Sequence, residues 1–135
     1  MKLTPYLNFA GNAEEALNFY AAVFDGEITM LSRYGDSPMP SDDDWKDKLI
    51  HARLSFEGNL VMISDAFKGQ PPLAAGNVQL SLEITDAAKI EAIFNAMAEG
   101  GKVTMPLQEQ FWGAKFGMLT DKFGISWMFN HELKK

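Results

Sequence analysis

This 135-residue sequence lacks cysteine, an excess of positive charge and any long apolar run. Without cysteine the chain can form no disulfide, thiolate metal site or cysteine nucleophile, which fits a reducing compartment. Twelve Lys and Arg residues face eighteen Asp and Glu residues, and the resulting net charge of -6 repels phosphate backbones and anionic membrane surfaces. We therefore expect no nucleic-acid partner and no membrane partner.

The amino-terminal stretch contains no hydrophobic segment that could act as a signal peptide or a spanning helix, because Pro5 and Asn8 interrupt it. We expect a cytoplasmic protein. Hydrophobic residues make up 47% of the chain and charged residues 22%, which are ordinary values for a globular protein. A chain of this length can bury a sizeable core, so we predict a single domain over residues 1–135.

The pattern of predicted elements occurs twice along the chain: a strand, a helix and then three strands with alternating apolar and polar residues. A linker rich in Gly and Pro, about residues 66–77, separates the two modules. In module one, about residues 1–65, we predict strands over 3–9, 27–34, 49–56 and 60–64 and a helix between Asn12 and Gly26. In module two, about residues 78–133, we predict strands over 78–85, 102–105, 115–120 and 125–130 and a helix between Asp86 and Gly100.

Asn12 and Asp86 are the predicted N-caps of the two helices, and Glu15 stands at the capping-box position of the first. The acidic loop over 35–48 has no counterpart in module two and is the predicted insertion. Within it, Asp42-Asp43-Asp44 indicates a solvated helical turn capped by Ser41, because the ligand spacing of a calcium loop is absent. One helix covers only one sheet face, so two such modules together bury more surface and leave a cleft, where we expect function.

Short motifs in the same order along residues 4–131 resemble the PhnB-like branch of the vicinal oxygen chelate superfamily. This superfamily includes glyoxalase I, extradiol dioxygenases, and fosfomycin and bleomycin resistance proteins. The motifs are Pro5-Tyr6-Leu7, Gly11-Asn12, Glu15-Ala16, Phe19-Tyr20, His51-Ala52, Met62 with Ser64-Asp65, Phe111-Trp112, Phe116-Gly117, Thr120-Asp121, Phe123-Gly124 and Trp127-Met128.

The resemblance implies an α+β fold of two βαβββ modules with curved mixed sheets around a cleft, a small-molecule ligand and a homodimer. Proteins of this branch are often labelled as resembling a demethylubiquinone methyltransferase. A methyl donor such as S-adenosylmethionine is commonly held by a glycine-rich turn between a parallel strand and a helix, and this chain has no Gly-x-Gly-x-x-Gly. We therefore do not expect methyltransferase activity.

Metal-dependent members of the superfamily carry His, Gln or Glu on the first and last strand of each module. Carried over by resemblance, these four positions fall near Pro5 or Tyr6 and at Met62, Gln79 and Met128. Only Gln79 offers a hard ligand, and thioethers do not suit magnesium, manganese or zinc. We expect no cofactor and no metal ligands, with a divalent metal as the alternative.

His51 and Arg53 share one face of their predicted strand, because side chains alternate with a period of two. On a cleft-lining face, His51 could act as a general base or hydrogen-bond donor and Arg53 could hold an anionic group. The alternative is a structural histidine that bonds the backbone or a carboxylate.

Gln79, Ser81 and Glu83 share the polar face of the first strand in module two. A buried Glu83 needs a partner, because an unpaired buried charge is costly. It could be an acid, a base or a ligand beside Gln79, or it could instead form an ion pair with Arg53 or Lys115.

Aromatic and thioether side chains in module two are typical of a small-molecule pocket. Trp112 lies beside Gly113 in a predicted loop and is expected to form a pocket wall, and Met128 is expected to place its thioether close to the same cleft. Trp127 is expected in the core, and His131, near the carboxyl end, is expected to be inert.

These patterns predict a protein that binds a small, partly aromatic or amphipathic molecule, either as a metal-independent enzyme or as a sequestering module. The predicted catalytic residues are His51 and Glu83. The predicted ligand-binding residues are Arg53, Met62, Gln79, Trp112 and Met128. The alternative is a metal-dependent lyase, isomerase or dioxygenase of the glyoxalase type, with His51, Gln79 and Glu83 as unusual ligands.

Overall fold

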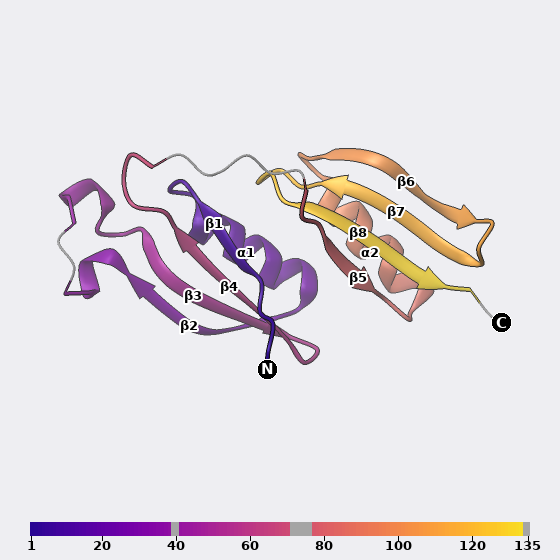
Figure 1. Ribbon diagram of the computed structural model, residues 1–135, viewed down its shortest axis with the longest axis horizontal. Coiled ribbons are helices and arrows are strands. Elements are labelled where there is room, and N and C mark those ends of the chain that lie inside the picture. The colour runs from indigo at the N-terminus through magenta and orange to yellow at the C-terminus, as the bar shows by residue number, and fades with distance from the viewer. Residues whose placement is uncertain (39–40, 71–76, 134–135) are drawn as a thin grey trace. The chain divides into compact units, whose positions relative to one another are not determined.

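The computed structural model describes residues 1–38, 41–70 and 77–133. The chain forms two compact units, Met1–Leu73 and Ala74–Lys135, and the boundary falls within the predicted linker. Residues 71–76 of that linker lie outside the described residues. The two units are described one at a time below (Figure 1).

The first unit is a four-stranded mixed sheet with one helix, in the strand order β1-β4-β3-β2. Strands β1 and β4 are parallel, whereas the other neighbours are antiparallel. Two short 3-10 turns, Tyr34–Asp36 and Asp43–Trp45, lie in the connection between β2 and β3. The elements are β1 (Tyr6–Phe9), α1 (Ala13–Phe24), β2 (Glu27–Arg33), β3 (Leu49–Phe56) and β4 (Asn59–Asp65).

The second unit repeats this topology in the order β5-β8-β7-β6, again with its first and last strands parallel. The predicted α+β fold with two βαβββ modules is confirmed, and neither sheet is closed. The elements are β5 (Leu80–Glu83), α2 (Ala87–Ala98), β6 (Lys102–Gln110), β7 (Ala114–Thr120) and β8 (Ser126–Glu132). Among the described residues, no helix is both long and apolar enough to cross a bilayer.

The helix of each unit covers one face of its own sheet (Figure 1). In β3, Ala52, Leu54 and Phe56 point toward α1 and are buried, as the alternating pattern predicts. The ring of Phe56 stacks on Phe24 of α1 with 4.5 Å between centroids. In the second unit, Phe94 of α2 meets Phe129 of β8 edge to face. No helix of the same unit covers the opposite face of either sheet in the described parts of the chain.

The helix termini differ between the units. Asp86 caps α2 as predicted, because its carboxylate accepts hydrogen bonds from the backbone N–H groups of Ala88 and Lys89. Asn12 makes no such bond, so the predicted capping box is wrong. Instead, the carboxylate of Asp65 at the end of β4 accepts from Gly11 and Ala13 at 2.8 and 2.9 Å. The cap of α1 therefore comes from a residue distant in sequence.

Two further predictions need correction: the strand predicted over 102–105 extends to Gln110 as β6, and Ser41 does not cap the turn in the insertion. The helix α1 ends through Asp25 in the left-handed conformation (φ 52°), and Gly26 follows it. The turn at Asp43–Trp45 is preceded by Asp42 rather than Ser41 at the cap position, without a side-chain cap bond. The predicted insertion is confirmed in its place, because fifteen residues, 34–48, connect β2 to β3, whereas only residues 111–113 connect β6 to β7.

Candidate functional site

The uncovered face of the first sheet carries a row of four side chains, one from each strand. The pairing register places Tyr6 beside Met62, Met62 beside Arg53 and Arg53 beside Met30. Residues that are direct neighbours on adjacent strands point to the same face. Arg53 therefore lies between two thioether side chains, and Tyr6 closes the row at the edge of the sheet.

His51 lies one step along β3 on this same face, as predicted, and joins Tyr6 to Arg53. The Tyr6 hydroxyl is 2.7 Å from Nδ1 of His51, and Arg53 Nε donates to Nε2 at 3.1 Å. Since Nε2 accepts, the proton of a neutral imidazole is on Nδ1, and this N–H donates to the tyrosine oxygen. The three side chains form a chain of hydrogen bonds, here named the Tyr6–His51–Arg53 chain.

Two causes hold His51 in its neutral form. Burial lowers the pKa of His51 below its ordinary value, and the positive charge of Arg53 lowers the pKa further. Protonation of Nε2 would also be unfavourable because its N–H would then face the N–H donor of Arg53 Nε. The alternative of a structural histidine bonded to backbone or carboxylate is not what the structure shows, because both ring nitrogens bond side chains of this face.

The groups at the two ends of the Tyr6–His51–Arg53 chain indicate what this face can bind. The Arg53 guanidinium uses only Nε within the described residues, which leaves the Nη groups for a carboxylate, phosphonate or similar anion. The Tyr6 hydroxyl accepts from His51, so its own proton can be donated outward. Tyr6 is 43% exposed and Met30 42%, so this face is accessible in the first unit.

Sequence reasoning placed His51 and Arg53 correctly on one face but missed Tyr6 as their partner. The missing information was the strand order, because β1 lies two strands from β3, with β4 between them. A Tyr at the first position of a short strand carries no local signal for such a contact. Met62, predicted as a ligand contact, lies in the row between Tyr6 and Arg53.

The uncovered face of the second sheet carries a thioether row instead. The register places Ser81 beside Met128, Met128 beside Met118 and Met118 beside Met105. Phe116 lies on the same face, one step along β7 from Met118. This face offers apolar and polarisable contacts, and Met128 has the surroundings expected of an apolar pocket residue.

Glu83 lies exposed at the end of β5, where Nδ2 of Asn130 donates to its carboxylate at 3.3 Å. The alternative ion pair with Lys115 is wrong, because Lys115 instead pairs with Glu91 at 2.7 Å. Gln79 precedes β5, and Ser81 rather than Gln79 is the register partner of Met128. The roles predicted for Glu83 and Gln79 remain predictions.

The remaining candidates are placed by the β6–β7 hairpin and by β8. Trp112 lies in the hairpin turn, is 53% exposed, and contacts Phe116 edge to face at 5.8 Å between centroids. Its role as a pocket wall remains a prediction. Trp127 is buried as expected, and its indole N–H donates to Asp121. His131 Nδ1 lies 2.8 Å from the Ile84 carbonyl oxygen, to which it donates.

Of the residues carried over to the superfamily's metal positions, only Gln79 offers a hard ligand, and Gln79 precedes β5 instead of pairing with Met128. The register pairs Tyr6 with Met62 in the first unit and Ser81 with Met128 in the second. None of these four side chains is a carboxylate or an imidazole, and thioethers suit soft ions rather than magnesium, manganese or zinc. No group of three or more His, Asp or Glu side chains suited to a metal occurs among the described residues.

Comparison with known proteins agrees with this architecture. A family model described as 3-demethylubiquinone-9 3-methyltransferase matches residues 1–129. The protein YjdN of Escherichia coli is 31% identical over 140 residues, which cover 96% of this chain and 95% of that protein.

Solved structures show the same fold. Protein PA1353 of Pseudomonas aeruginosa is 42% identical with a TM-score of 0.90, and the match covers 99% of both chains. A PhnB protein of Bacillus cereus, titled a putative 3-demethylubiquinone-9 3-methyltransferase, is 33% identical with a TM-score of 0.83 and covers 97% of this chain and 99% of that one. A glyoxalase/bleomycin resistance/dioxygenase domain from Frankia, 14% identical with a TM-score of 0.71 over 98% of this chain and 97% of that one, shares the fold.

Proposed function

Because this chain belongs to the PhnB-like family, within the glyoxalase/bleomycin resistance/dioxygenase superfamily, we propose that it binds a small organic anion without a metal. The binding surface is the uncovered face of the first sheet. Arg53 holds the anionic group, the Tyr6 hydroxyl donates a second hydrogen bond, and Met30 and Met62 contact the apolar part of the molecule.

The single observation that supports this proposal most is the Tyr6–His51–Arg53 chain. His51 fixes the direction of both neighbours, since it donates to one and accepts from the other. Two donors are thereby oriented toward the space above the sheet before any ligand arrives. Such preorganisation lowers the entropy cost of binding.

The same hydrogen bonds favour binding over proton abstraction by His51. In the neutral ring only Nε2 has a lone pair that can accept a proton, and this lone pair already accepts the hydrogen bond from Arg53. His51 could serve as a general base only after Arg53 moves away. A sequestering or binding role therefore needs no rearrangement, whereas an enzyme that uses His51 as its base would have to break this bond first.

Methyl transfer, the activity in the names of the matched family and of the Bacillus cereus protein, gains no support from the turn that opens α1. The backbone N–H groups of Gly11 and Ala13 at this turn already donate to Asp65. They are not available to hold an anionic cofactor group. We also propose, on the resemblance alone, that the protein acts as a cytoplasmic homodimer, which sedimentation analysis and cell fractionation test.

The binding proposal is tested by NMR titration of the ¹⁵N-labelled protein with benzoate and phenylphosphonate, with benzamide as the neutral control. We expect saturable shifts of the Arg53 Nε–H signal and of the β3 amides with the two anions and none with benzamide. Arg53→Met should weaken binding about tenfold or more, as expected for loss of one charge-assisted contact.

Lys102→Met removes the same charge from an exposed position on β6 and serves as the matched control. It should leave the affinity unchanged. Saturable binding of benzamide equal to that of benzoate, an unchanged affinity of Arg53→Met, or the absence of saturable shifts with both anions would overturn the proposal.

A further inference from the structure

The connection between β2 and β3, which has no counterpart in the second unit, encloses a pocket with the segment that follows β4. Its volume is about 270 Å³, close to the lower end of small-ligand pockets. The lining side chains are Tyr34, Ser41, Asp42, Trp45, Phe67 and Lys68. All six lie in the first unit, and none takes part in the Tyr6–His51–Arg53 chain.

Three aromatic rings form the walls, and two of them are fixed by hydrogen bonds. The Tyr34 hydroxyl donates to the Asp65 carbonyl oxygen at 2.8 Å, and the Trp45 indole N–H donates to the Ala66 carbonyl oxygen at 3.2 Å. Phe67 meets Tyr34 edge to face with 6.0 Å between centroids and is 52% exposed. The pocket therefore has two rigid aromatic walls and one accessible aromatic wall.

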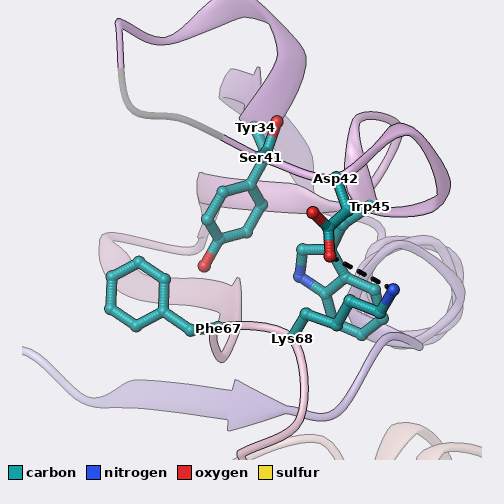
Figure 2. A pocket seen from close by; sticks show the side chains of 6 residues that line it. All are labelled: Tyr34, Ser41, Asp42, Trp45, Phe67 and Lys68. Atoms are coloured by element: carbon teal, nitrogen blue, oxygen red, sulfur yellow. Dashed lines mark ion pairs between the residues drawn. The ribbon is translucent and has the colours of Figure 1, made fainter.

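The polar groups at the pocket are arranged around the ammonium group of Lys68. Lys68 Nζ lies 3.3 Å from the Asp42 carboxylate and 2.8 Å from the Asp44 carboxylate. Figure 2 shows the ion pair between Asp42 and Lys68 on the Trp45 side, with the rings of Tyr34 and Phe67 across the opening. Counting the neighbouring charges, the carboxylates of Asp42, Asp43, Asp44 and Asp47 outnumber the ammonium groups of Lys46, Lys48 and Lys68 by one, so the site remains attractive to a further cation.

Asp42 is 72% exposed, so a carboxylate alone would hold a cation only weakly in water. The aromatic walls add attraction, because the faces of Trp and Tyr rings bind cations that shed their hydration easily. Trp45 already shows this behaviour: the ammonium of Lys48 lies 5.7 Å from its ring centroid. Methylated ammonium groups are weakly hydrated and suit such a site better than a metal ion does.

We propose that this pocket binds a small molecule through a methylated ammonium group, which contacts the aromatic walls and competes with Lys68 for Asp42. The pocket is separate from the anion site proposed on the sheet face. The two proposals are independent: a ligand need not carry both an anionic and an ammonium group, and each site is tested by its own probe.

The probe is choline, and its neutral isostere 3,3-dimethylbutan-1-ol is the matched control, both at constant ionic strength. Binding is followed by the NMR signal of the Trp45 indole N–H and the amide signals of Phe67 and Lys68. We expect saturable shifts at millimolar choline and an affinity for the isostere about fivefold lower or less. Equal binding of both compounds, or no saturable shift with choline, would overturn the proposal.

Variants separate the pocket from general electrostatic attraction. Asp42→Asn and Phe67→Ala should each weaken choline binding about fivefold, whereas Lys68→Met should strengthen it because the competing ammonium is lost. Asp43→Asn removes the same charge from a side chain that is 95% exposed, pairs with Lys46 and does not line the pocket. Similar losses in Asp42→Asn and Asp43→Asn, or weaker binding in Lys68→Met, would show that the pocket is not the site.

Discussion

The uncovered sheet faces of the two units pair their strands in the same register but carry different chemistry. Where the first unit has Tyr6, Met62, Arg53 and Met30 in a row, the second has Ser81, Met128, Met118 and Met105. The methionines on the second and last strands of each unit are common to both rows, whereas the charge and the hydroxyl donor of an aromatic ring occur only in the first. The repeat therefore preserves the backbone and the helix-covered face, while the other face is free to change.

The units also differ in how a buried carboxylate is used, and this difference predicts the largest effect. Asp65 accepts from Gly11, Ala13 and Leu49, which ties α1 and β3 to β4. Asp121 accepts from Phe123, Ile125 and Trp127, which lie two to six residues away in the sequence. We expect Asp65→Asn to destabilise the protein by about 3 kcal/mol, because an amide presents a donor to backbone N–H groups.

Asp121→Asn is the comparison variant and should cost about 1.5 kcal/mol, because a local turn can relax around the change. Urea unfolding followed by circular dichroism measures both values. If the two variants lose equal stability, long-range anchoring by Asp65 is not the source of the difference.

A second comparison uses the glycine that follows each helix. A methyl group at Gly101 would collide with the carbonyl oxygen of Thr120 and lie 3.0 Å from the Cα of Asp121. At Gly26 the nearest atom is the Leu54 side-chain Cδ1 at 2.9 Å, which can move. We expect Gly101→Ala to cost about 2–3 kcal/mol and Gly26→Ala about 1 kcal/mol, measured by thermal and urea unfolding. A larger loss in Gly26→Ala would contradict this ranking.

The third comparison concerns the ion pair between a strand and the helix in each unit. Arg33 makes two parallel hydrogen bonds of 2.8 Å to Glu14, whereas Lys115 makes a single contact with Glu91. The bond from Arg33 lowers the pKa of Glu14, so this stabilisation is present above pH 4.5 and is lost as the pH falls further. Glu14→Gln should cost about 0.5 kcal/mol near pH 7, because the pair is partly exposed.

Glu91→Gln should change the unfolding midpoint by less than can be resolved, since Glu91 is exposed. Urea midpoints at pH 7 and pH 3.5 measure both variants. The difference in urea midpoint between the two variants should narrow at the lower pH, and a difference that stays constant would contradict the electrostatic account.

The smallest expected effect is on the pKa of His51, the histidine of the first unit. Burial and the charge of Arg53 lower the pKa of His51, so the unfolded state binds this proton more tightly. Stability attributable to His51 is therefore complete above the unfolded pKa of about 6.5 and falls as the pH drops through the folded pKa. Arg53→Met should raise the pKa of His51, measured by NMR titration of the ring protons, and an unchanged pKa of His51 would contradict this account.

Much of the fold follows from local patterns, because burial on one side of an element imposes a period on its sequence. The alternation over 49–56 located β3 with its bounds, and Asp86 identified the start of α2. The prediction at Asn12 failed, although Asn is a common cap, because its side chain makes no cap hydrogen bond and the distant carboxylate of Asp65 instead bonds the neighbouring N–H groups of Gly11 and Ala13. Local propensity cannot report a competitor that arrives from another strand.

The candidate site shows the same limit. Period-two spacing was enough to place His51 and Arg53 on one face, and the lack of hard ligands at Met62 and Met128 was visible in the sequence. The pocket beside the β2–β3 connection was not predicted, because Tyr34, Trp45 and Phe67 carry no shared local pattern. Their convergence depends on where β2 and β4 end in space.

The sequence by itself determined the two repeated modules, the helix-covered faces and the place of the insertion. These features depend on residue types and short spacings, which local sterics and burial translate directly into structure. Only the tertiary structure decided that Tyr6 meets His51, that Asp65 caps α1 and that an acidic insertion surrounds an aromatic pocket. Each of these contacts joins residues far apart in the chain, and strand order, rather than spacing, sets their distance.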